Sequence, residues 1–205
     1  MSDLICVTNR KLCTGDYLTR IEEIAKQHPK GILLREKDLS PLAYTQLAKK
    51  VLAICKRHQT LCILHNFIET AEQTGCPAIH LPLPVLRNMT EQQKRIFPVI
   101  GSSCHSLPEA KEAEMLGCTY ITAGHIFETK NKKKLPGRGL AFLSEICGSI
   151  TIPVYGIGGI HKENISAIRG TKAAGAFLMS GIMQCKDVSA FLKNFEKNGE
   201  KNDIS

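Results

Sequence analysis

The stretches Ile152-Pro-Val-Tyr-Gly-Ile-Gly-Gly-Ile160 and Ala174-Gly-Ala-Phe-Leu-Met-Ser-Gly181 decide the fold. Each begins as a short apolar run and ends in small residues. Apolar runs without polar alternation are typical of strands that are buried on both faces of a parallel sheet. The two stretches therefore predict parallel strands at Ile152–Gly156 and Ala174–Met179, each followed by a turn whose small residues let a ligand approach the backbone.

Six similar runs precede these strands, at Leu4–Val7, Gly31–Leu34, Leu61–Leu64, Ala78–Leu81, Val99–Ser102 and Thr119–Ala123. Helical patterns lie between or after the runs, at Tyr17–His28, Leu42–Arg57, Leu107–Leu116 and Val188–Phe195. Eight alternating units favour a closed (β/α)8 TIM barrel over an open α/β sheet. After the fourth strand, Pro82, Pro84 and the short stretch Glu91–Ile96 predict an irregular crossover. We expect one domain over residues 1–192 and a frayed polar tail over 193–205.

The composition indicates a globular protein with a small anionic ligand. Of 205 residues, 43% are hydrophobic and 22% charged, and the net charge is +8. Aromatic residues make up 5% and Trp is absent, which argues against nucleic acid as a partner. No apolar stretch approaches a membrane span. The nine cysteines form no Cys-x-x-Cys pair, so we expect reduced thiols and a cytoplasmic protein; the sequence leaves a homo-oligomer open.

Two turns after the last two strands are candidates for a phosphate site. Gly158 and Gly159 follow the seventh run, and Ser180 and Gly181 follow the eighth. In a TIM barrel the loops after these strands commonly bind phosphate through backbone N–H groups. One Gly-Gly pair alone would indicate only a turn, but two such turns at neighbouring strand ends favour phosphate binding.

Cations and hydroxyl groups at other strand ends are candidates for a second anionic group. Arg35 and Lys37 follow the second run, and Ser103 and His105 follow the fifth. These side chains are expected near the barrel mouth, where they can bind a carboxylate. The alternative for the second strand is a surface ion pair with Glu36.

His125 is the candidate for proton transfer. It follows the sixth run and opens a basic, glycine-containing loop that includes Lys132 and Arg138. A histidine at a strand end, beside a loop that can cover a ligand, is placed for acid–base catalysis near neutral pH. No strand end supplies an Asp, and the His and Cys spacings do not suggest zinc, so we expect no metal.

The motifs, in this order, resemble those of the thiamine phosphate synthase superfamily: Leu33-Leu34-Arg35-Glu36-Lys37, Ile100-Gly101-Ser102-Ser103-Cys104-His105-Ser106, Gly124-His125-Ile126-Phe127-Glu128-Thr129, Ile157-Gly158-Gly159-Ile160 and Met179-Ser180-Gly181-Ile182. The resemblance extends from about residue 4 to 185. Synthases of this superfamily carry Asn-Asp after strand three and Asp beyond strand four, which hold magnesium, and Pro before the loop after strand six. The matching positions here look like His65-Asn66, Val85 and His125.

The His125 loop, with Gly137-Arg138-Gly139, instead resembles the thiazole tautomerase (TenI) branch. That resemblance implies an isomerase of thiamine biosynthesis, which needs no cofactor and aromatises a carboxythiazole ethyl phosphate with His125 as its acid–base catalyst. It implies phosphate binding at Gly158, Gly159, Ser180 and Gly181, and other substrate contacts from Arg35, Lys37, Asn66, Ser103, His105, Thr129, Lys132 and Arg138. The alternatives are thiamine phosphate synthase, and a non-catalytic or regulatory protein that binds thiazole or thiamine phosphate on the same barrel.

Overall fold

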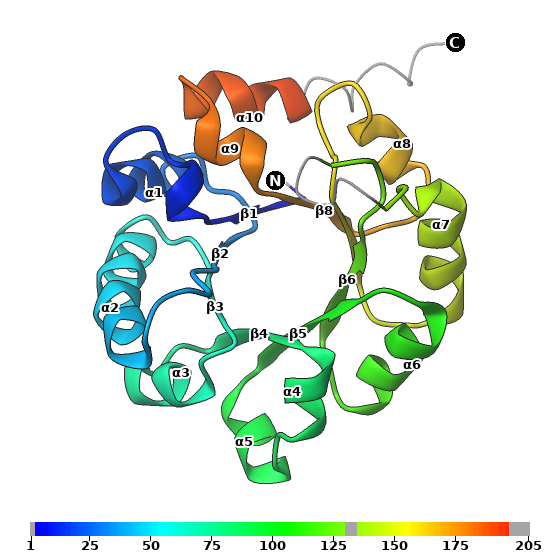
Figure 1. Cartoon of the computed structure of the whole chain (residues 1–205), viewed down its shortest axis with the longest axis horizontal. Coiled ribbons are helices and arrows are strands. Elements are labelled where there is room, and N and C mark those ends of the chain that lie inside the picture. Colours follow the sequence, from blue (N-terminus) through cyan, green and yellow to red (C-terminus); the bar gives the residue numbers. More distant parts are fainter. Residues whose placement is uncertain (1–2, 130–134, 197–205) are drawn as a thin grey trace.

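The computed structural model describes residues 3–129 and 135–196 and confirms the predicted TIM barrel (Figure 1). Its strands pair in parallel in chain order, and β1 also pairs with β8, which closes the barrel. The strands are β1 (Leu4–Val7), β2 (Gly31–Leu34), β3 (Cys62–His65), β4 (Ala78–Pro82), β5 (Val99–Cys104), β6 (Tyr120–Gly124), β7 (Val154–Ile157) and β8 (Gly175–Leu178).

Helices surround the barrel (Figure 1). They are the 3-10 turn η1 (Arg10–Leu12) and the α-helices α1 (Tyr17–Ala25), α2 (Pro41–Arg57), α3 (Ile68–Thr74), α4 (Leu83–Arg87), α5 (Glu91–Ile96), α6 (Leu107–Met115), α7 (Gly139–Ser149), α8 (Ile165–Arg169), α9 (Ser180–Gln184) and α10 (Val188–Glu196). The expectation of an irregular crossover after the fourth strand is wrong in part. Pro84 occupies the first turn of α4, where a helix needs no amide donor from it.

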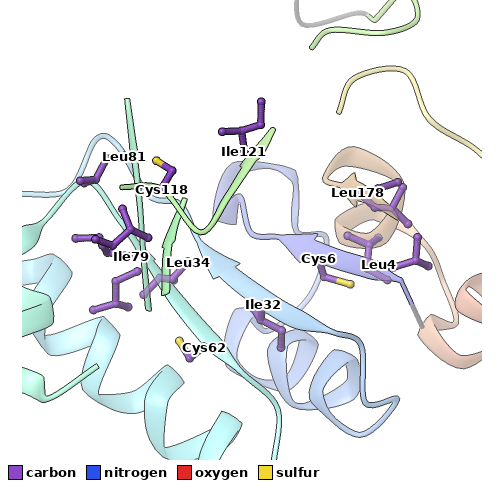
Figure 2. Packing of buried hydrophobic residues seen from close by; sticks show 14 of the residues in the cluster. Leu4, Cys6, Ile32, Leu34, Cys62, Ile79, Leu81, Cys118, Ile121 and Leu178 are labelled. Carbon is purple, nitrogen blue, oxygen red and sulfur yellow. The ribbon is translucent and has the colours of Figure 1, made fainter. Parts of the chain in front are cut away.

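The continuous apolar runs arise because both faces of each strand are buried. Along β1, Leu4 and Cys6 pack outward against the helices, whereas Ile5 and Val7 point into the barrel. The outward layer of several strands is seen in Figure 2. Because successive side chains of a strand point to opposite faces, this alternation fixes which strand-end residues can reach the barrel mouth.

The barrel interior is filled by aromatic side chains in its lower part and becomes polar toward the mouth. Tyr120, Tyr155 and Phe177 pack with one another, and Gly101 makes room for Tyr120, since a methyl group on Gly101 would overlap its ring. Above this layer lie His65 and His80, whose ring centroids are 6.0 Å apart. The packed lower barrel therefore supports a polar floor beneath the strand ends.

Two sequence expectations concern the molecule as a whole. All nine cysteines are free thiols. No helix within the described ranges, 3–129 and 135–196, is both long and apolar enough to cross a membrane. At the C-terminal end, α10 continues to Glu196, past the expected domain boundary at 192, and residues 197–205 lie outside the described residues.

Candidate active site

A cavity of about 620 Å³ opens at the carboxyl ends of the strands. This volume lies within the usual range for small-ligand sites. Most of the predicted site residues line it: Arg35, Lys37, Ser103, His105, His125, Thr129, Gly158, Gly159, Ser180 and Gly181. The structure thus brings the candidate phosphate turns, the candidate cations and the candidate catalytic histidine to one site, although they are spread over much of the chain.

Three predicted residues are not among the lining residues. Asn66 is exposed and lies outside the cavity, because its neighbour His65 takes the inward position at the end of β3. Arg138 is also exposed: its guanidinium lies over the Phe142 ring at 5.1 Å, and only its backbone N–H approaches the site, donating to the His125 carbonyl. Lys132 lies outside the described residues.

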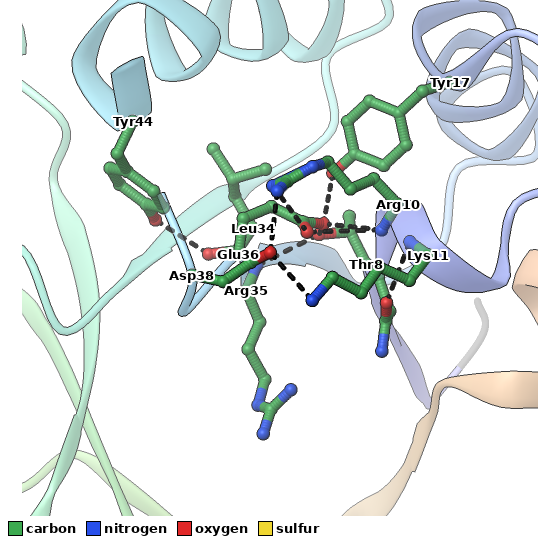
Figure 3. Close-up of polar contacts among 10 residues, drawn as sticks. Thr8, Arg10, Lys11, Tyr17, Leu34, Arg35, Glu36, Asp38 and Tyr44 are labelled. Carbon is green, nitrogen blue, oxygen red and sulfur yellow. Dashed lines mark hydrogen bonds and ion pairs between the residues drawn. The ribbon is translucent and has the colours of Figure 1, made fainter. Parts of the chain in front are cut away.

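Strand alternation also separates Arg35 from Glu36. Figure 3 shows the Arg35 side chain directed away from the Glu36 carboxylate, and no ion pair joins them within the described residues. For Arg35, the alternative of a surface ion pair with Glu36 is therefore wrong. Burial lowers the pKa of the Arg35 guanidinium, which lines the cavity as an anion-attracting group.

Glu36 instead anchors the turn after β1. Its carboxylate is 3% exposed and accepts hydrogen bonds from the Thr8 hydroxyl at 2.9 Å, the Tyr17 hydroxyl at 2.7 Å and the Arg10 backbone N–H at 3.0 Å (Figure 3). The Thr8 hydroxyl in turn accepts from the Arg35 backbone N–H at 3.0 Å. This network fixes the end of β2 and so positions the backbone that carries Arg35.

His125 begins the loop after β6, with a cis peptide bond between Gly124 and His125. It is 7% exposed and lines the cavity. Its Nε2 lies 3.1 Å from the Leu135 carbonyl oxygen. A carbonyl oxygen can only accept, so Nε2 carries the proton and the lone pair of the neutral ring is on Nδ1. No hydrogen bond to Nδ1 occurs among residues 3–129 and 135–196, which leaves this nitrogen available as a base.

His105 supports the same loop from the neighbouring strand. Its Nδ1 lies 2.9 Å from the Gly124 carbonyl oxygen, and its backbone N–H donates to the Glu109 carboxylate at 2.5 Å. Because the Gly124 carbonyl belongs to the peptide bond that precedes His125, this contact holds the backbone of the candidate catalytic residue.

The candidate phosphate turns present backbone donors to the cavity. Within the described residues, the amides of Gly159 and Ile160 have no hydrogen-bond acceptor, and those at the start of α9 belong to a first helical turn, which leaves them without helical partners. Several N–H groups without a protein acceptor therefore belong to residues that follow β7 and β8 and line the same cavity.

The glycines of the first turn have a second role, which their sequence did not indicate. A methyl group on Gly158 would collide with the backbone of His125, at 2.9 Å from its Cα, and one on Gly159 would collide with the backbone of Phe127, at 2.8 Å from its carbonyl carbon. Both also have positive φ, +98° and +67°. A larger residue at Gly159 would displace the His125 loop as well as a phosphate, so such a variant does not report on phosphate binding alone.

His65 and His80 line the cavity floor and were not predicted as site residues. Burial, and to a smaller extent the positive charges of Arg35 and Lys37, lowers the pKa of His80 to about 3. Burial, the charge of His80 and the same two cations lower the pKa of His65 to about 2. Both rings are therefore neutral near pH 7. Alternation along β3 and β4 is the signal that could have found them, because it turns both side chains inward.

These low pKa values predict that the protein loses stability in acid. A histidine whose folded pKa is depressed keeps its stabilising contribution above its unfolded pKa, about 6.5, and loses it as pH falls toward the folded value. Each ring then contributes a slope of up to about 1.4 kcal/mol per pH unit below pH 6. Urea unfolding between pH 7.5 and pH 5 should show a smaller loss for His80→Gln than for the wild type. The matched control is His161→Gln at an exposed position; equal slopes for His80→Gln and wild type would contradict the prediction.

Comparison with known proteins identifies the family. The family model described as thiamine monophosphate synthase (TMP-TENI) matches residues 4–182. The chain belongs to this family. A family member from Fusobacterium nucleatum, thiamine-phosphate synthase, is 33% identical over 196 residues, covering 94% of both chains. Thiamine-phosphate synthase 2 from Streptococcus pneumoniae is 31% identical, covering 95% of this chain and 93% of its own.

Comparison with solved structures agrees with the family assignment. Thiamine phosphate pyrophosphorylase from Pyrococcus furiosus superposes with a TM-score of 0.82 and 28% sequence identity, covering 95% of this chain and 93% of its own. This TMP-TENI protein is therefore an enzyme of a thiamine-biosynthesis family. The named relatives are synthases, so their names do not point to the tautomerase branch that the loop of His125 resembles.

Proposed function

We propose that the protein is a thiazole tautomerase, which aromatises a carboxythiazole ethyl phosphate tautomer without a metal ion. The observation that carries the proposal is His125: it lines the cavity, and its contact with the Leu135 carbonyl leaves Nδ1 as the basic nitrogen. The loop motif from Gly124 to Thr129 supports the same assignment, because it resembles that of the tautomerase branch.

The reaction is an isomerisation and needs one group that both accepts and donates a proton. The substrate is a dihydrothiazole with an exocyclic double bond, a carboxylate at ring carbon 2 and an ethyl phosphate arm. His125 Nδ1 takes the proton from carbon 2, the electron pair moves through the ring, and the imidazolium returns the proton to the exocyclic carbon. The product is the aromatic thiazole, and no electron acceptor or leaving group is required.

The remaining lining residues fit a substrate with two anionic ends. The N–H groups near Gly159 and Ser180 suit the phosphate, and Arg35, Lys37 and Ser103 suit the carboxylate. Thr129 and His105 lie on the side of the cavity that bears His125. Glu109 is the one carboxylate among the described lining residues, and it already accepts the His105 amide, so the cavity favours anions.

The residues present do not fit the magnesium ion that the synthases of the superfamily hold. The positions that match its Asn and Asp ligands carry the neutral His65, the exposed Asn66 and the apolar Val85 of α4. Within the part of the chain that the structure describes, no three His, Cys, Asp or Glu side chains converge as metal ligands. Oxygen ligands, chiefly carboxylates, are what magnesium requires.

Thiamine phosphate synthase is the second candidate. It is favoured by the names of the relatives and by Arg35 and Lys37, which could bind a pyrophosphate. The two candidates differ in substrates and in metal requirement, so one pair of assays separates them.

We expect tautomerase activity that persists in EDTA, and no thiamine phosphate formation when the protein is given the pyrimidine pyrophosphate, the thiazole phosphate and magnesium. The reason is that the carboxylates needed to hold the metal are absent from the matching positions. Thiamine phosphate can be measured by chromatography, with the Fusobacterium nucleatum synthase as positive control. Efficient magnesium-dependent synthesis would replace the tautomerase proposal with the second candidate.

A further inference from the structure

A chain of three polar side chains crosses the floor of the cavity. The Tyr120 hydroxyl lies 3.0 Å from His80 Nδ1, and His80 Nε2 lies 2.8 Å from the Ser103 hydroxyl oxygen. The three residues come from the neighbouring strands β4, β5 and β6, and Gly101 leaves the space that the Tyr120 ring occupies. Ser103 and His80 line the cavity, whereas Tyr120 lies in the packed layer beneath it.

The proton positions along this chain follow from burial. His80 is 2% exposed, and its pKa of about 3 leaves the ring neutral with a single N–H. Burial raises the pKa of Tyr120 well above its usual value, so the phenol keeps its proton. Within the described residues, His80 is the one hydrogen-bond partner of the Tyr120 hydroxyl. A buried hydroxyl that donated to nothing would be destabilised, so Tyr120 donates to Nδ1.

The direction of the remaining bonds is then fixed. Because Nδ1 accepts from Tyr120, the single ring proton of His80 is on Nε2, and this N–H donates to the Ser103 oxygen. The Ser103 hydroxyl group therefore donates its own hydrogen to a different acceptor. Since Ser103 lines a cavity that also contains Arg35 and Lys37, that acceptor is an anionic group of the ligand.

We infer that Tyr120 and His80 are positioning residues that make the Ser103 hydroxyl an obligate donor to the substrate carboxylate. This inference rests on the proposed function. Ser103 pairs in register with Thr122, three residues before His125. A carboxylate held by Ser103 brings ring carbon 2, to which it is attached, toward β6, the strand that His125 directly follows. The same contact therefore selects carboxylated thiazoles and presents the carbon that loses its proton.

The test compares two ligands, the aromatic carboxythiazole phosphate and the thiazole phosphate that lacks the carboxylate. Their Kd values are measured by titration calorimetry for the wild type, Tyr120→Phe, Ser103→Ala and the double variant. The matched control is Tyr155→Phe, which removes a hydroxyl from the same buried layer but is not part of the chain. Thermal unfolding checks that each variant folds, and Ser103→Thr tests whether a retained hydroxyl restores affinity.

We expect Ser103→Ala to raise the Kd of the carboxylated ligand by about 10- to 100-fold, the usual effect of losing one hydrogen bond to a charged group. Tyr120→Phe should raise the same Kd by about tenfold, because His80 loses the hydrogen bond that fixes its proton on Nε2. In the double variant, Tyr120→Phe should cause no loss of affinity beyond that of Ser103→Ala, since Tyr120 acts through Ser103. The ligand without the carboxylate should bind all variants alike, and Tyr155→Phe should match the wild type.

The outcomes separate this inference from the function on which it rests. In one result, the wild type prefers the carboxylated ligand while the losses of affinity in Tyr120→Phe and Ser103→Ala simply add; in another, Tyr120→Phe raises the Kd of both ligands equally. Either result would show that the positioning role is wrong, and the tautomerase proposal would stand. If the wild type does not bind the carboxylated ligand at all, the proposed function is wrong and the inference falls with it.

Discussion

Replacement of His125 by Asn is expected to lower kcat for aromatisation by about 10²–10⁴-fold, the usual contribution of general acid–base catalysis. Asparagine has no basic nitrogen, so neither half of the proton transfer can proceed through it. The affinity for the aromatic product should change little, because the proposed phosphate and carboxylate contacts come from other strand ends. Aromatisation can be followed by ultraviolet absorbance and corrected for the spontaneous rate.

The matched control for this variant is His105→Asn. His105 also lines the cavity, but its Nδ1 donates to the Gly124 carbonyl and supports the loop. We expect its loss to reduce activity much less than the loss of His125. A saturated kcat of His125→Asn within a few-fold of the wild type would remove His125 from the proton-transfer role and make His105 the next candidate for it.

Introduction of a carboxylate at the candidate phosphate turn should abolish tight binding of phosphorylated ligands. Ser180 is exposed at the start of α9 and lines the cavity. Ser180→Asp places a negative charge at the proposed phosphate site, where it would compete for the backbone N–H donors, so we expect Kd to rise by at least about 100-fold. The fold should tolerate the change, because an acidic residue in the first turn of a helix is favourable.

Two comparisons make this second result specific. Ser166→Asp introduces the same charge in the first turn of α8, at an exposed position that does not line the cavity, and should leave Kd unchanged. The ligand without its phosphate should bind wild type and Ser180→Asp alike. Equal Kd values of the phosphorylated ligand for wild type and Ser180→Asp would place the phosphate elsewhere in the cavity.

The barrel could be predicted from the sequence because its strands are buried on both faces and therefore appear as short apolar runs. Strand boundaries differ by one or two residues at several positions, such as β7, which begins at Val154 and not at Ile152. Pro153 precedes the strand and has no N–H to donate to a ladder. The five-residue helices α8 and α9 were not predicted, because so few residues show no helical periodicity and such helices depend on tertiary packing.

Within the site, the prediction is most accurate for residues whose position in a strand decides whether the side chain points into or out of the barrel. Arg35 and Ser103 share the inward parity of their strands, and both line the cavity. Asn66 was misplaced: it follows the inward-facing His65 just beyond the end of β3, its φ is +70°, and its side chain is exposed outside the cavity. The same rule would have found His65 and His80.

Other features of the site depend on contacts between distant segments and have no local signal. The approach of the His125 loop to Gly158 is a tertiary contact between β6 and β7, and only the structure shows that it requires glycine there. The contact of the Arg138 guanidinium with the Phe142 ring is local, four residues along the chain, but the motif that suggested a substrate-binding arginine did not indicate it.

The most direct test of the account is the rate at which the wild-type protein aromatises the carboxythiazole phosphate tautomer in the presence of EDTA, followed by ultraviolet absorbance against the spontaneous reaction. The account predicts a saturable acceleration that EDTA does not diminish and that His125→Asn reduces by about 10²–10⁴-fold. A rate with wild-type protein equal to that of the buffer alone would contradict it.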